Sequence, residues 1–151
     1  MRTVCSTARL GRVLALLLAM ASGTVWGAVI SVPAGGDLQA ALNSATYGDV
    51  VQLEAGTYAG PIVFQGRMVT VQGQVDANGV PLSIINGGGG TYESVVAFCT
   101  NEGREIVLEN VQITGGSSYW GSPGGIYIRE ASPTIRNCLI TGNSSPRGGG
   151  S

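Results

Sequence analysis

Two stretches near the end of the chain are similar, with four of eight residues identical: LENVQITG at Leu108–Gly115 and IRNCLITG at Ile135–Gly142. Their central asparagines, Asn110 and Asn137, occupy the same place in each stretch, 27 positions apart. Self-similarity at a period of roughly 20–50 residues is the signature of repeat architectures. The repeat predicts a fold in which one short unit is wound again and again onto the last.

The composition around this repeat favours short strands joined by tight corners. Glycine accounts for 25 of 151 residues, well above the usual share of about 7%. The glycine runs alternate with aliphatic triplets, which a disordered linker lacks. The expected strands are Val29–Val32, Val50–Leu53, Ile62–Phe64, Val69–Gln72, Ser83–Ile85, Val95–Phe98, Ile106–Leu108, Val111–Thr114, Ile126–Ile128 and Thr134–Ile140.

One segment has helical periodicity instead. Leu38, Ala41, Leu42 and Ala45 recur at the spacing of a single apolar helix face. Asp37 precedes them, and its short carboxylate suits an N-cap. A short amphipathic helix at this position predicts a cap over the first end of the repeat array, where core and backbone would otherwise be exposed.

The matched asparagines predict a structural ladder. If successive coils stack, Asn110 and Asn137 lie at the same corner, where an inward amide can bond the backbone of the turn. The same register stacks three other pairs: Leu108–Ile135, Ile113–Ile140 and Glu109–Arg136. The first two are aliphatic and inward. The third is an outward ion pair, worth at most about 1 kcal/mol if exposed. We expect a three-sided stack of about four to five coils.

The amino terminus is typical of an export signal. Arg2, Arg9 and Arg12 precede an apolar run at Val13–Ala21, which is too short to span a bilayer. Small residues follow, and cleavage after Gly27 fits the pattern; a buried helix or an uncleaved anchor is the alternative. We expect a signal peptide at 1–27, a strand and capping helix at 28–48, coils at 49–151, and a secreted or cell-surface location.

After that cleavage the chain keeps five arginines, all nine acids, and neither lysine nor histidine. The net charge of about −4 disfavours nucleic acid and anionic membrane as partners. The remaining cysteines, Cys99 and Cys138, fall on different faces of the expected coils. We therefore expect no disulfide between these two residues, although export would permit one.

These features together resemble a known family. The entry segment Val32–Leu42, with Gly48–Leu53 and Gly56–Tyr58, and the repeats from Ser94 to Asn143 are similar to bacterial right-handed parallel β-helix proteins of the pectin-lyase-like superfamily. The resemblance covers nearly all of residues 29–151. It implies an all-β, right-handed parallel β-helix with a short amino-terminal capping helix. It implies little about activity, since such folds host many functions.

Enzymes of that superfamily cut acidic polysaccharides with clustered carboxylates, which hold calcium beside an arginine or lysine base, or act as an acid–base pair. Here the carboxylates are scattered, and neither an Asp-Asp pair nor Asp-x-Asp occurs. No catalytic, metal or cofactor residue carries over. We expect a non-catalytic exported module contacting extracellular polysaccharide. The alternative is the front part of a polysaccharide lyase or glycoside hydrolase.

Four residues are the candidate glycan contacts. Tyr127 and Arg129 should face outward from their strand, where a ring can stack on a sugar and a guanidinium can pair with a uronate. Tyr119 and Trp120 lie in a loop between coils. The alternative for Tyr127 and Arg129 is an ordinary exposed strand face. For Tyr119 and Trp120 it is packing against the wall of the solenoid. The sequence shows no carboxyl-terminal cap, so self-association through that end is also expected.

Overall fold

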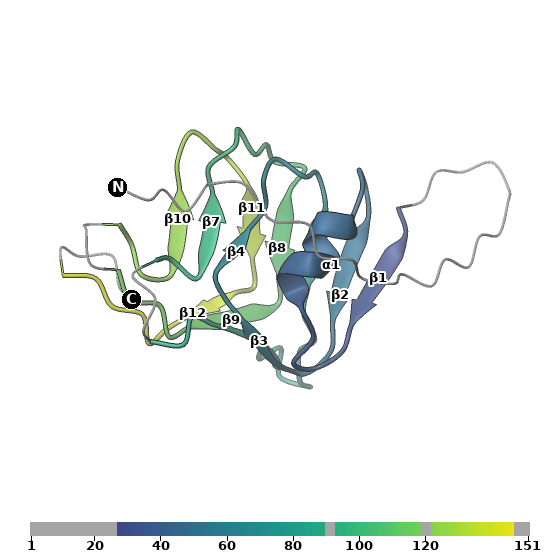
Figure 1. Ribbon diagram of the computed structural model, residues 1–151. Helices are drawn as coiled ribbons and strands as arrows, with labels where there is room; N and C mark the ends of the chain where they lie inside the picture. The colour runs from purple at the N-terminus through teal and green to yellow at the C-terminus, as the bar shows by residue number, and fades with distance from the viewer. Residues whose placement is uncertain (1–26, 90–92, 119–121, 147–151) are drawn as a thin grey trace, which may run out of the picture.

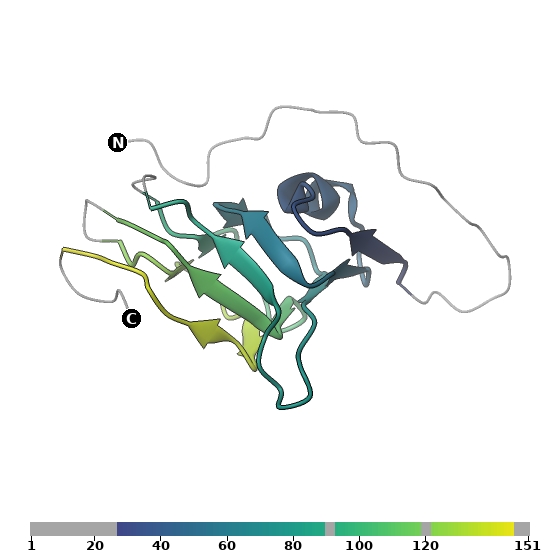
Figure 2. The ribbon, with the colours of Figure 1, turned by 90° about the horizontal axis from the view of Figure 1, so that it is seen from below.

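The computed structural model describes residues 27–89, 93–118 and 122–146. These residues form three parallel sheets and one short helix, an all-β architecture like that of a β-helix. Figures 1 and 2 show the sheets as walls around a common interior, with α1 beside the first strands. The expected signal peptide lies outside the described residues except for Gly27. No helix in the described part of the chain is both long and apolar enough to cross a membrane.

Each sheet gathers strands from distant parts of the chain. Sheet A contains β1 (Val29–Val32), β2 (Val50–Leu53), β5 (Thr70–Gln72), β8 (Val107–Glu109) and β11 (Thr134–Arg136). Sheet B contains β3 (Gly56–Ala59), β6 (Ser83–Asn86), β9 (Val111–Thr114) and β12 (Leu139–Ile140). Sheet C contains β4 (Ile62–Val63), β7 (Val96–Phe98) and β10 (Ile126–Ile128).

From β2 onward the chain visits the sheets in the fixed order A, B, C. We call one such visit a circuit. The described residues hold three complete circuits and a fourth that comprises β11 and β12. The predicted stacking of the two look-alike stretches is confirmed: the registers pair Leu108 with Ile135, Glu109 with Arg136, and Ile113 with Ile140.

Two strand predictions were wrong. Thr134–Ile140 is not one strand but β11 and β12, because Asn137 between them takes a left-handed backbone with φ of 51°. The strand β3 was missed, since Gly56–Ala59 holds one large apolar residue. That residue, Tyr58, is fully buried and donates its hydroxyl proton toward the carbonyls of Val32 and Glu54, at 2.9 and 2.8 Å.

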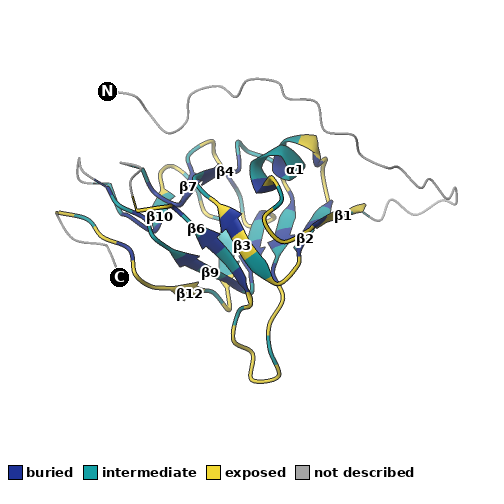
Figure 3. Cartoon of the chain, turned by 60° about the horizontal axis from the view of Figure 1, so that its bottom comes forward, coloured by how far each residue is buried: buried dark blue, intermediate teal, exposed yellow. Residues whose placement is uncertain are grey.

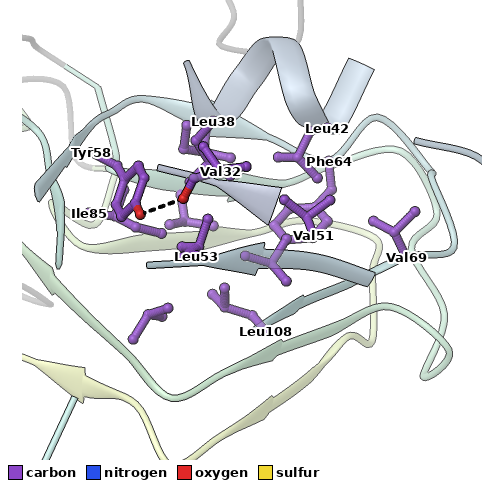
Figure 4. Packing of buried hydrophobic residues seen from close by; sticks show 14 of the residues in the cluster. Val32, Leu38, Leu42, Val51, Leu53, Tyr58, Phe64, Val69, Ile85 and Leu108 are labelled. Carbon is purple, nitrogen blue, oxygen red and sulfur yellow. Dashed lines mark hydrogen bonds between the residues drawn. The ribbon is translucent and has the colours of Figure 1, made fainter. Parts of the chain in front are cut away.

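The core consists of inward rows that run across the circuits. In sheet A one row includes Val51, Val71 and Leu108, each at most 1% exposed. The rings of Phe64 and Phe98 stack with centroids 4.5 Å apart. Figure 4 shows this packing, with Leu38 and Leu42 of α1 pointing into it. Burial of these rows is what holds the circuits together.

The helix α1 (Leu38–Ser44) begins as predicted. The Asp37 carboxylate accepts a hydrogen bond from the Ala40 N–H at 2.9 Å. Leu38 and Leu42 are 1% and 0% exposed. On the polar side, the Gln39 amide bonds both backbone groups of Val63 in β4: it accepts from N–H at 2.8 Å and donates to C=O at 3.1 Å. The side chain thus completes the first edge of sheet C as a neighbouring strand would.

Candidate functional site

A shallow, open hollow lies at the corner between sheets A and B. Its volume is about 530 Å³, within the range common for ligand sites. One wall is the loop of residues 73–82, which projects away from the sheets and is mostly exposed (Figure 3). We call this hollow the corner groove, and it is lined by Val75, Gly79, Val80, Pro81, Asn110, Asn137, Cys138 and Leu139.

The loop wall is held in shape by Asp76. Its Oδ1 accepts hydrogen bonds from the N–H groups of Asn78 and Val80, both at 2.8 Å. These bonds, with that of Val80 the largest contribution, lower the pKa of the Asp76 carboxyl. Gly79 supplies the positive φ, 82°, that the turn requires. The turn presents Val75 and Val80 at the surface, 39% and 47% exposed.

The opposite wall contains the two matched asparagines. Asn110 and Asn137 take φ of 58° and 51° at the same corner of successive circuits, a conformation that asparagine tolerates better than most residues. Their predicted equivalence holds, but their inward orientation does not: Asn137 is exposed, and both border the corner groove. A positive φ turns the corner here, so no inward amide is needed to satisfy it.

The asparagine that does bond the interior is Asn143, which sequence reasoning missed. It is 9% exposed, and its amide donates to the carbonyls of Ile113 and Thr141, at 3.0 and 3.2 Å. Its Oδ1 accepts from the Gly116 N–H at 2.9 Å. The only signal in the sequence is its place directly after the Thr-Gly pair that ends the repeat.

Cys138 also lines the groove, as a half-buried free thiol. It therefore does not pair with Cys99, as expected. Its Sγ–H lies 3.3 Å from the carbonyl of Arg136 and 3.6 Å from that of Leu108. Burial raises the pKa of the Cys138 thiol, so the group contributes a weak donor and an apolar surface rather than a thiolate.

The two predicted glycan contacts that the structure describes, Tyr127 and Arg129, do not line the corner groove. Tyr127 in β10 is partly exposed, and its partners in sheet C are Ala97 and, beyond that, Val63. Arg129 follows β10 and is exposed, but its guanidinium lies 3.7 Å from the Glu130 carboxylate. Tyr119 and Trp120 lie outside the described residues. The described residues therefore place only Tyr127 and Arg129, which lie in and just after β10.

A polar ladder on the outer face of sheet A was also missed in part. The Gln52 amide donates to the Gln72 carbonyl at 3.1 Å, and the Gln72 amide donates to Glu109 at 2.8 Å. Arg136 then pairs with Glu109, as predicted. The Arg136 side chain is 59% exposed, whereas that of Glu109 is only 9% exposed. Gln72 and Arg136 flank it on the neighbouring strands.

Most described carboxylates take part in the local architecture. Asp49 is 7% exposed and accepts bonds from Ala28 N–H, Thr46 N–H and the Thr46 hydroxyl. Glu102 is 2% exposed and accepts from the N–H groups of Thr100 and Gly66, at 2.6 and 3.1 Å. Among the described residues, no three histidine, cysteine or acidic side chains gather as a metal ion would need.

The chain matches no protein-family model, no curated protein and no solved structure.

Proposed function

We propose that the chain is an exported, right-handed parallel β-helix module that binds extracellular polysaccharide without acting on it. The cyclic order of strands and the parallel registers support the β-helix part of the proposal. The resemblance to the pectin-lyase-like superfamily, whose enzymes cut acidic polysaccharides, is the reason to propose a polysaccharide as the ligand. The pattern of residues 1–27 supports removal of a signal peptide after Gly27.

The corner groove is the observation that carries the binding role. One wall is aliphatic, formed by Val75, Val80 and Pro81, and suits the C–H face of a sugar ring. The other wall offers the amides of Asn110 and Asn137, each with donors and an acceptor for hydroxyl groups. The two asparagines come from successive circuits, whose strands lie about 4.8 Å apart, so the groove offers polar groups at two neighbouring positions.

The engaged carboxylates favour a binding module over the front part of a lyase or hydrolase. Asp37, Asp49, Asp76 and Glu102 each hold backbone N–H groups, and Glu109 is held by Gln72 and Arg136. A carboxylate that ties down the backbone is poorly placed to move a proton to or from a substrate. Tyr127 and Arg129 remain a second contact surface, weakened by the pairing of Arg129 with Glu130.

Native electrophoresis in gels that contain alginate, pectin or a neutral glucan tests the binding role. We expect at least one polysaccharide to retard the wild-type protein. V80D and N137A should lose most of that retardation, because each removes one wall of the groove. V29D is the matched control, since Val29 is also an exposed valine but lies in β1, away from the groove.

The outcomes separate the candidate surfaces. Loss of retardation in Y127A and R129A, with V80D unaffected, would transfer the site to sheet C and reject the groove. No retardation by any of the polysaccharides would reject the glycan role. Mass spectrometry of the secreted protein tests export separately, and we expect a mature chain that begins at Ala28.

A further inference from the structure

The tip of the loop of residues 73–82 is an Asn-Gly pair, Asn78–Gly79, and a second such pair, Asn86–Gly87, follows at the end of β6. In an Asn-Gly pair the backbone nitrogen of the glycine can attack the side-chain amide of the asparagine. The approach is easiest before glycine, because glycine has no side chain to block it. The chain therefore offers the same chemistry at two places whose surroundings differ.

The reaction needs no reactant other than water. The Gly79 nitrogen forms a bond to Cγ of Asn78 while the bond from Cγ to the side-chain NH₂ breaks. The amide proton of Gly79 leaves with that NH₂ as ammonia, and a five-membered succinimide ring remains. Water then opens the ring at either of its carbonyls, which gives aspartate or isoaspartate. A carboxylate replaces the amide in both products.

The first pair has room for this ring. Asn78 and Gly79 are both exposed. Among the described residues, nothing beyond the chain neighbours of Gly79 lies within 4 Å of the place where its Cβ would be. The Gly79 N–H donates to the Asp76 carbonyl at 3.0 Å, but this bond lies within the turn itself. An exposed turn opens by local fluctuation, without unfolding of the sheets.

The second pair is held by the neighbouring circuit. Gly87 is buried, and its N–H donates to the carbonyl of Thr114 at 2.9 Å. Oδ1 of Asn86 accepts from the Gly88 N–H at 2.8 Å. The same oxygen lies against Gly115, where an added Cβ would meet it at 2.2 Å. Cγ of Asn86 and the nitrogen of Gly87 can therefore react only after this part of sheet B opens.

We propose that Asn78 is a modification site at which the folded protein converts its own asparagine to aspartate and isoaspartate, while Asn86 stays intact. The new carboxylate arises beside that of Asp76. The N–H of Val80, followed by the N–H and the side chain of Asn78, bonds the Asp76 carboxylate and lowers its pKa. A carboxylate at position 78 removes the side-chain donor and sets like charges together. Isoaspartate also adds a backbone atom between Asp76 and Val80.

The modification therefore loosens the turn that forms the loop wall of the corner groove. Asp76 Oδ1 now bridges the N–H groups of Asn78 and Val80, both at 2.8 Å, and the longer or more charged turn no longer suits both bonds. The modification itself does not depend on the glycan role of the groove.

Peptide mapping by mass spectrometry, after incubation of the purified chain at mildly alkaline pH, tests the site. Fragmentation assigns each product to its residue, because a carboxylate is heavier than the amide it replaces. In the folded protein, conversion should be at least about tenfold faster at Asn78 than at Asn86. In urea the two pairs should react at similar rates, since the fold no longer separates them. Conversion that is absent at Asn78, or no faster there than at Asn86, in the folded protein would overturn the proposal.

Amide exchange at Val80 tests the effect on the loop. Exchange should become severalfold faster as wild-type protein converts, and N78D should show the faster exchange from the start. N78S is the matched control: it has no side-chain amide to lose, so incubation should leave its exchange at Val80 unchanged. Equal exchange in fresh wild type, converted wild type and N78D would show that the turn tolerates the new carboxylate and would overturn its loosening.

Discussion

The first and last described circuits belong to the same three sheets, but their apolar side chains are covered to different extents. At the first end, Leu42 of α1 is fully buried and Gln39 bonds the edge strand β4. At the last described circuit, Ile128 and Ile140 are 47% and 40% exposed, and no described element covers them as α1 covers the first circuit. The contrast teaches that a repeat unit does not complete itself: each circuit is buried by its neighbours, and an end must be closed by something other than a repeat.

The largest expected effect compares two isoleucines in one row. I113A should lower the free energy of unfolding by about 2–5 kcal/mol, because Ile113 is fully buried between circuits. I140A, the same change one circuit later, should cost less than half as much, because Ile140 is already 40% exposed. Urea denaturation followed by circular dichroism measures both. Equal losses would contradict the difference in burial between Ile113 and Ile140.

The next effect concerns the closed end. Q39A should lower the free energy of unfolding by about 1–3 kcal/mol, because the N–H and C=O of Val63 lose their partner. S44A, on the same helix but exposed, serves as the control and should change stability by less than about 0.5 kcal/mol. Amide exchange at Val63 should accelerate in Q39A alone. Unchanged exchange would show that α1 does not seal this edge.

A smaller, pH-dependent effect comes from Asp49, which ties β1 to the rest of sheet A. Burial by itself would raise the pKa of Asp49, but hydrogen bonds from Thr46 and Ala28 outweigh it and lower the pKa below its ordinary value of 3.8. A lowered folded-state pKa means that the carboxylate stabilises the fold above the unfolded pKa, and that this contribution is lost as pH falls through the folded pKa.

D49N should therefore be less stable than wild type by about 1–2 kcal/mol near neutral pH, and the gap should shrink below about pH 4. Thermal melts at a series of pH values measure the difference. A gap that persists or widens in acid would contradict the assignment of these bonds to an ionised Asp49.

The smallest expected effect concerns Arg136 in β11, in the last described circuit. R136A should cost less than about 1 kcal/mol, because the Arg136 side chain is 59% exposed and water screens its pairing with Glu109. The loss should decrease further in about 1 M salt. Denaturation curves at low and high salt measure it. A loss as large as that of I113A would show that the last circuit is covered in solution.

Many of the strands were predictable from the sequence, because their positions depend on the periodicity of apolar residues. The strands β1, β2, β9 and β10 and the Asp37 cap were placed from the alternation and spacing of apolar residues alone. The repeat also gave the register of Leu108 over Ile135. These features follow from side chains that must face one interior at regular intervals.

The corners and the groove were harder to predict, because they depend on backbone conformation and on variable loops. The polar ladder links residues 20, 37 and 27 positions apart along the chain, so no fixed offset reveals it. The corner groove depends on the loop of residues 73–82, which has no counterpart at Asn110 or Asn137. Glycan contacts were sought among aromatic and charged residues, whereas this hollow is lined by valines and amides.

The distance between the outermost strands of sheet A tests the stacked arrangement most directly. Spin labels can be attached at V29C and T134C after the three native cysteines are replaced by serine, and the distance measured by pulsed electron paramagnetic resonance. The registers place these residues in one row, four strand spacings apart. We predict a single backbone separation of roughly 19 Å. A separation below about 10 Å, above about 30 Å, or a broad spread over both would contradict parallel stacking of the circuits.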